Sequence, residues 1–482
     1  MILYPYFIAL ATGLCLTHRI LRGSRAAKGY VRCILALGLG LGICSQISFY
    51  TQLACQGWDM CSTTLLHLLA MFLPLGCYFF FVRQPSTDTK TTVRGFIGSK
   101  KELLALLAMC LYLVPMVFYC LMRPSGDWDA HSVWNQSAKY ILFTGNPLDT
   151  TLTNNHPPLL PFLTVWGWNL SQQHDWIMPA TYSILFTVAT AMVIFLFLNQ
   201  YTKTIVAFFA SLSFLSTPFV IWHSVSQYAE PEFAFYLIAV CACFFIAIEE
   251  EDRHWGFLGG LFLGLFSFTK REANITTFLF LLLLFLVFRN KMAKETSTRK
   301  IVLFFLIGFS CTFLASLVFK SLPSTSLAER QFDLDASNDV ESKQLNQMMT
   351  FLGIHEFGAF FKNFTSDRII TVERFAFKTL SNKDWIFIWP LLAAGWLVCI
   401  KRALHNKTIL LFLLFVLSYF SIYFSFTILQ TWEIEKFMFE TLSRTLFEML
   451  PVALCLFFLM VFPEKGTQSQ QHNKNKDVHD NA

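Results

Sequence analysis

FAFYLIAVCACFFIAI, residues 233–248, is an apolar run without a charged side chain. A helix over this run and its flanking residues is long enough to cross roughly 30 Å of hydrocarbon. Similar runs recur along the 482 residues of the chain, of which 55% are hydrophobic and only 14% are charged. A soluble protein with so few charged residues would precipitate. We therefore predict an all-α, polytopic transmembrane protein.

The lengths of the hydrophobic runs predict about 12–14 membrane helices. The expected spans lie near residues 2–16, 33–49, 65–82, 103–122, 177–198, 205–222, 233–248, 255–268, 275–288, 301–320, 385–400, 409–429 and 447–462. The run from Pro157 to Leu170 is shorter and is followed by polar residues. We expect it to be re-entrant or to lie beside the membrane.

Clusters of Lys and Arg between these runs predict which loops are cytoplasmic. Such clusters lie near residues 19–32, 83–101, 289–300 and 401–407. This orientation makes residues 122–156 a first outer loop and residues 321–384 a second outer loop, with helices lying on the membrane surface. Residues 1–462 then form a single transmembrane domain, and residues 463–482 form a polar, disordered cytoplasmic tail.

The charge and cysteine patterns exclude several kinds of partner. The formal net charge of +6 is modest, and the basic residues are spread over short clusters. Such a pattern orients helices in a membrane and indicates no nucleic-acid partner. Most of the cysteines lie within apolar runs, and no CxxC motif or His/Cys ligand spacing occurs. A zinc or redox site therefore has no support.

Asp127 and Asp129 are the strongest candidates for chemistry, because acidic residues directly after a membrane span are costly. A carboxylate at this surface could deprotonate a hydroxyl group while its neighbour orients the acceptor or binds a divalent cation. Alternatively, both side chains cap the helix that starts near His131. Capping accounts comfortably for one acid, and we expect a catalytic role for at least one of the two.

The segment after the aspartates predicts a surface helix that carries Trp134 and Lys139. This helix either supports the interface or forms a wall of a groove, with Lys139 near an anionic head group. His156 precedes two prolines at a helix start, where it either faces water or contacts a phosphate or an acceptor sugar.

Three cations and one further acid are expected on the same outer face. Lys270 and Arg271 interrupt an apolar run, and Arg444 lies at the mouth of the last span. Each of these cations could bind a lipid phosphate. The alternative for Lys270 and Arg271 is a plain loop with an internal ion pair. Glu230 either begins a helix or belongs to the site.

Several of these segments, in order, resemble the C-type glycosyltransferase superfamily. Asp129-Ala130, Trp134-Asn135, Ala138-Lys139 and the segment from His156 to Pro161 are similar to its first outer loop. The segments Gln227 to Pro231, Gly259 to Glu272, and Ser443-Arg444 with Pro451 are similar to later motifs. The resemblance is to bacterial protein O-mannosyltransferases and lipid A aminoarabinose transferases. Three predicted spans precede the first loop, where many relatives have one.

The resemblance implies that residues 1–462 form an inverting glycosyltransferase with the corresponding membrane fold. Its donor would be a polyprenyl-phosphate sugar and its acceptor a glycan, a lipid or a protein, with transfer of a hexosyl or pentosyl group. Asp129 fits the base of this family better than Asp127 does. A bacterial inner membrane with an outward-facing site is the expected setting. The alternatives are a transporter or flippase of lipid-linked saccharides, and a non-catalytic assembly factor.

Overall fold

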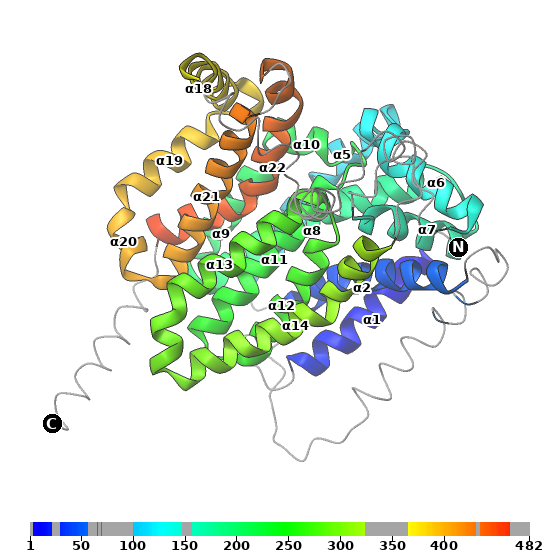
Figure 1. Ribbon diagram of the computed structural model, residues 1–482, viewed down its shortest axis with the longest axis horizontal. Coiled ribbons are helices and arrows are strands. Elements are labelled where there is room, and N and C mark those ends of the chain that lie inside the picture. Colours follow the sequence, from blue (N-terminus) through cyan, green and yellow to red (C-terminus); the bar gives the residue numbers. More distant parts are fainter. Residues whose placement is uncertain are drawn as a thin grey trace, which may run out of the picture.

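The computed structural model describes residues 3–21, 29–55, 65, 69, 100–146, 157–322, 365–429 and 434–462. Within these residues every regular element is a helix, so the all-α prediction is confirmed. Figure 1 shows these helices packed as one bundle, with α1 and α2 at one side and α19 and α20 at the other. Most of the predicted span near residues 65–82, the residue His156 and the tail after residue 462 lie outside the described residues.

The chain up to residue 215 contributes the helices α1 (Tyr4–Ile20), α2 (Gly29–Ala54), α4 (Lys100–Cys110), α5 (Leu113–Met122), α6 (Asn135–Thr144), α7 (Leu159–Ser171), α8 (Ile177–Tyr201) and α9 (Thr204–Leu215). The rest contributes α10 (Pro218–His223), α11 (Glu230–Glu249), α12 (Arg253–Ser267), α13 (Arg271–Lys294), α14 (Thr296–Ser321), α18 (Ser366–Leu380), α19 (Ile388–Val398), α20 (Ile400–His405), α21 (Lys407–Leu429) and α22 (Ile434–Val461). A short π-helical turn, η2 (Ala130–Trp134), precedes α6, and a short 3₁₀ turn, η3 (Lys383–Trp385), precedes α19.

Eight helical segments of the described chain are long and apolar enough to cross a membrane. They are α2, the pair α4 and α5, α8, α11, α13, α14, α21 and α22. Residues 205–222, which we expected to form one span, form two helices, because α9 ends at Leu215 and α10 begins at Pro218. Thr217 between them has an extended backbone, and a residue that precedes proline disfavours the helical conformation.

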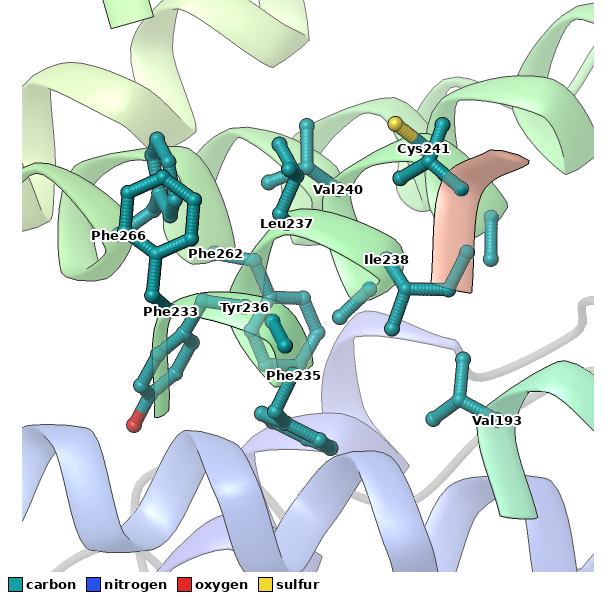
Figure 2. Packing of buried hydrophobic residues seen from close by; sticks show 14 of the residues in the cluster. Val193, Phe233, Phe235, Tyr236, Leu237, Ile238, Val240, Cys241, Phe262 and Phe266 are labelled. Carbon is teal, nitrogen blue, oxygen red and sulfur yellow. The ribbon is translucent and has the colours of Figure 1, made fainter. Parts of the chain in front are cut away.

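Helix α11 forms the centre of the bundle, because neighbouring helices bury all of its side chains from Glu230 to Ile248. Figure 2 shows residues from Phe233 to Cys241 along this helix, with Phe262 and Phe266 of α12 among the side chains packed against it. The Tyr236 hydroxyl donates to the carbonyl of Gly38 in α2 at 2.9 Å. A helix that is apolar on every side is expected in such an internal position.

Helices α12 and α14 run parallel and pack closely against each other. Gly260 of α12 lies directly against the backbone carbonyl of Phe305 in α14, and a Cβ atom there would clash with it. Close approach at small residues is the usual basis of helix packing in membranes, where water does not drive association. The two helices stay in contact as far as Ser267 of α12 and Ser316 of α14. The Ser316 Oγ donates to the Ser267 carbonyl oxygen at 3.0 Å.

Residues 157–170 were expected to be re-entrant or to lie beside the membrane, and the burial of helix α7 contradicts the second of these possibilities. All of its residues are buried by other helices, so it is an internal helix and does not lie on the lipid surface. The Ser45 hydroxyl of α2 donates to the Leu159 carbonyl at its start, at 2.6 Å. The Gln46 amide donates to the Thr312 carbonyl of α14 at 2.7 Å. The additional N-terminal helix α2 thus joins α7 to α14.

Candidate functional site

The loop that carries the two aspartates is fixed to the loop after α10 by uncharged hydrogen bonds. The backbone N–H of Asp127 donates to the Ser226 carbonyl at 3.1 Å. The Gln227 side chain donates to the Pro124 carbonyl and accepts from the Asn135 side chain, both at 2.8 Å. These contacts bring residues about a hundred positions apart into one place.

The structure separates the roles of the two aspartates. Asp127 Oδ1 accepts from the backbone N–H of Trp128 at 2.8 Å, and its Oδ2 lies 3.8 Å from Arg123. Asp129 occupies the cap position before η2, but its side chain makes no capping hydrogen bond. The Asp129 carboxylate instead pairs with Arg444 Nη1 of α22. Capping therefore does not account for Asp129.

Arg444 connects Asp129 to the deeper part of the site. Its Nη1 also lies 3.8 Å from Glu230 Oε1, and its guanidinium carbon lies 4.5 Å from the centre of the Tyr228 ring. The Tyr228 hydroxyl accepts from the backbone N–H of Asp129 at 3.1 Å. Burial raises the pKa of Tyr228 to about 12, so this hydroxyl stays protonated at neutral pH. Tyr228 thus positions both members of the ion pair.

Lys270 lies behind this pair and binds two glutamates. Its Nζ lies 3.0 Å from Glu230 Oε1 and 2.7 Å from Glu448 Oε1. The Tyr419 hydroxyl of α21 donates to Glu448 Oε2 at 2.8 Å. Burial alone would lower the pKa of Lys270, but the charges of Glu230 and Glu448 overcome this effect and raise it. Lys270 is therefore a permanent cation.

These residues form a chain of charges that we call the charge chain: Asp129, Arg444, Glu230, Lys270 and Glu448. It has an accessible end and a buried end. The side chains of Asp129 and Arg444 are 24% and 28% exposed. Those of Lys270, Glu230 and Glu448 are 10%, 2% and 3% exposed. Solvent therefore reaches the first pair, whereas the second group is enclosed by protein.

The other predicted site residues are not part of the charge chain. Trp134 is buried in a small apolar cluster that also contains Tyr228, while Lys139 is exposed on α6. Arg271 is half-buried at the start of α13, and its charge acts on Lys320 at the end of α14. In the described chain, no group of three His, Cys, Asp or Glu side chains is arranged to hold a metal ion.

Sequence reasoning missed Glu448, Tyr419 and His223. Glu448 follows Arg444 by four residues on one helix, a spacing that places both on the same face. That spacing was readable in the sequence, whereas nothing around Tyr419 in its apolar run distinguishes it. His223 is fully buried, 4.8 Å from the Phe219 ring and 5.0 Å from the Phe447 ring. Burial lowers the pKa of His223 to about 3, so it is neutral.

The helical bundle and its long apolar helices define an integral membrane protein. Residues 155–315 match the family model of dolichyl-phosphate-mannose-protein mannosyltransferase, a domain of the C-type glycosyltransferase superfamily. The resemblance predicted from the sequence is thereby confirmed, and the matched part includes Tyr228, Glu230 and Lys270. No curated protein and no solved structure matches the chain significantly. The match supports a membrane glycosyltransferase of the mannosyltransferase type.

Proposed function

We propose that the protein is an inverting glycosyltransferase acting on the extracytoplasmic face of its membrane. It moves a hexosyl or pentosyl group from a polyprenyl-phosphate carrier to a glycan, lipid or protein acceptor. The observation that carries the proposal is the accessible Asp129–Arg444 pair, which continues through Glu230 to the buried Lys270. A lipid-linked donor also explains why these groups lie in a protein with so many membrane helices.

Asp129 is the general base in this proposal. The acceptor hydroxyl oxygen forms a bond to C1 of the sugar, and its proton passes to the Asp129 carboxylate. The bond between C1 and the phosphate oxygen breaks, and its electron pair leaves with the polyprenyl phosphate. Attack from the side opposite the leaving phosphate inverts C1. Asp127 is occupied by the Trp128 N–H and lies near Arg123, so it supports the loop.

Arg444 and Lys270 hold the carboxylates in position. Arg444 orients Asp129 and is itself held over the Tyr228 ring. Lys270 binds both Glu230 and Glu448, which offsets their charges in the interior. These contacts supply the rigid surroundings that a base requires to act without reorganisation.

The outer location rests on the distribution of basic residues. The clusters near residues 19–32, 289–300 and 401–407 are expected on the cytoplasmic side. The loop with Asp129, the start of α13 and the first turns of α22 all lie between such clusters, at the opposite helix ends. A polyprenyl-phosphate donor displayed on that face would meet Asp129 at the membrane boundary.

The test is a transfer assay with the purified full-length protein in detergent. Radiolabelled polyprenyl-phosphate sugars and a membrane extract supply the donor and the acceptor, with and without a chelator. We expect transfer by the native protein, and a decrease of about 10²- to 10⁴-fold in Asp129→Asn. The variant should elute as the native protein does in size-exclusion chromatography, because the amide keeps the shape of the carboxylate.

Undiminished transfer by Asp129→Asn would remove the base and overturn the assignment. Movement of the labelled lipid between the leaflets of vesicles without sugar transfer would favour a flippase instead. Loss of transfer with chelator alone would show that a divalent cation takes part.

A further inference from the structure

The first turns of α12 and α14 lie side by side, because the two helices pack in parallel. A Cβ atom on Gly256 of α12 would lie 2.9 Å from the Ile301 carbonyl oxygen of α14. The guanidinium carbon of Arg253, the first residue of α12, lies 4.9 Å from the centre of the Phe304 ring. Lys300 precedes Phe304 by four residues, a spacing that makes the two side chains neighbours on the surface of α14. Arg253 and Lys300 therefore lie next to the same aromatic ring.

These two cations have no acidic partner among the residues that the structure describes. None of the ion pairs there includes Arg253 or Lys300, and both residues are exposed. The nearest acids in the sequence have other partners. Asp252 caps α12 by accepting from a backbone N–H at 2.9 Å, and Glu295 lies 3.4 Å from Lys291 Nζ. An anion from outside the protein can therefore bind both cations.

An apolar face of α14 begins beside the two cations. Its residues follow Lys300 at intervals of three or four positions, so they share one side of the helix, which we call the α14 stripe: Phe304, Ile307, Cys311 and Leu314. Phe304 is half-buried, and the other three are exposed. From Phe304 to Leu314 the stripe is about 15 Å long, which is half the thickness of a hydrocarbon core of roughly 30 Å. The stripe therefore matches the depth of one leaflet.

We propose that Arg253 and Lys300 bind the phosphate of an anionic phospholipid, and that one of its acyl chains lies along the α14 stripe. Lys and Arg at a membrane boundary attract anionic lipids, and an arginine can donate two parallel hydrogen bonds to a phosphate. A choline head group suits the site less well, because its own cation would be repelled by the two side chains.

This lipid site is separate from the charge chain. It lies at the start of α12, whereas Lys270 of the charge chain follows the end of that helix. The helix starts at Arg253 and Lys300 belong to the side of the bundle that we propose to be cytoplasmic. The inference therefore goes beyond the proposed function and does not depend on sugar transfer.

Lipid binding to the full-length protein tests this assignment. The protein in a mild detergent is titrated with phosphatidylglycerol, phosphatidylcholine or inorganic phosphate, and native mass spectrometry counts the bound molecules. We expect phosphatidylglycerol to bind more tightly than the other two. Arg253→Gln and Lys300→Gln should each raise its Kd roughly fivefold, since each removes one attraction to the phosphate. Lys300→Arg should retain binding.

Two further variants separate this site from a general attraction to basic surfaces. Lys401→Gln removes an exposed cation from α20, in a different basic cluster, and changes the net charge by the same amount. It is the matched control and should leave the Kd unchanged. Ile307→Asn places an amide on the α14 stripe and should weaken the binding of phosphatidylglycerol, because the acyl chain loses an apolar contact.

Three results would overturn the inference. Equal Kd values for the Lys300→Gln and Lys401→Gln proteins would indicate attraction to the basic surface as a whole. Equal affinities for phosphatidylglycerol and phosphatidylcholine would mean that the two cations do not select an anionic lipid. Inorganic phosphate that binds as tightly as phosphatidylglycerol would indicate a site for a free anion. If Arg253→Gln does not fold, the comparison of Lys300→Gln with Lys300→Arg decides.

Discussion

The two ends of the charge chain use the same kind of ion pair in different surroundings. At the accessible end, Asp129 and Arg444 keep about a quarter of their side-chain surface exposed. At the buried end, Lys270 binds two glutamates that are almost fully enclosed. Exposed pairs contribute little to stability, whereas breaking a buried pair leaves a charge without a partner. We therefore expect the accessible end to serve the proposed chemistry and the buried end to serve folding.

The largest expected effect is at the buried end. Lys270→Met removes the cation between Glu230 and Glu448, and we expect a loss of about 3–5 kcal/mol in the free energy of unfolding. Unfolding in a titration with denaturing detergent measures it. Lys139→Met, on the exposed face of α6, is the control and should unfold as the native protein does. A Lys270→Met protein as stable as the native one would contradict the comparison.

Arg444→Gln tests the accessible end. We expect transfer to fall about a hundredfold, because Asp129 loses the group that orients it. The loss of stability should stay near 1 kcal/mol, since water reaches both partners. Transfer assays and detergent titrations on the same preparation give the two values. A variant that unfolds readily but transfers sugar at the native rate would reverse the roles of the two ends.

His223 gives the buried region a dependence on pH. Its pKa is lowered from 6.5 to about 3 by burial, an effect that Arg444 and Lys270 reinforce and Glu230 opposes. Between pH 3 and pH 6.5, His223 binds a proton in the unfolded chain but not in the folded protein. Its contribution to the free energy of unfolding is therefore fully present above pH 6.5 and decreases as the pH falls. At pH 5 the loss is about 2 kcal/mol.

The corresponding experiment compares unfolding at pH 7.5 and pH 5 for the native protein and His223→Phe. Phenylalanine fits among the rings of Phe219 and Phe447 and cannot bind a proton. We expect the variant to lose about 2 kcal/mol less than the native protein between the two pH values. An equal pH dependence in both proteins would mean that other groups cause it.

The smallest effect is expected for Asp127→Asn. Its side chain retains an oxygen that can accept from the Trp128 N–H, and the Arg123 partner is more than half exposed. We expect less than about 1 kcal/mol of lost stability and a transfer rate close to native. A decrease in transfer as large as that in Asp129→Asn would show that both aspartates take part in the reaction.

Hydropathy predicted most of the long helices, because a segment that crosses a membrane must be apolar over its whole length. The hydropathy prediction failed at Pro218, because the residue before a proline disfavours the helical conformation. It also failed for α7, because hydropathy does not tell whether an apolar helix is enclosed by protein or by lipid. The meeting of Asp129, Glu230, Lys270 and Arg444 at one end was anticipated from loop orientation and motif order. Glu448 was missed although its spacing from Arg444 was readable in the sequence, whereas Tyr419 was missed because only the fold brings it to Glu448.

The contact at Gly126 between the loop that carries the aspartates and the loop after α10 determines how this region responds to salt. Gly126 has a φ of 77°, and a Cβ atom there would lie 2.7 Å from the Ser226 carbonyl oxygen. The bonds that fix Asp129 nearby join backbone, amide and phenol groups, none of which carries a charge. Dissolved salt screens charges but leaves such bonds intact. We therefore expect the loop that carries Asp129 to keep its position at high salt, whereas the partly exposed Asp129–Arg444 ion pair is weakened.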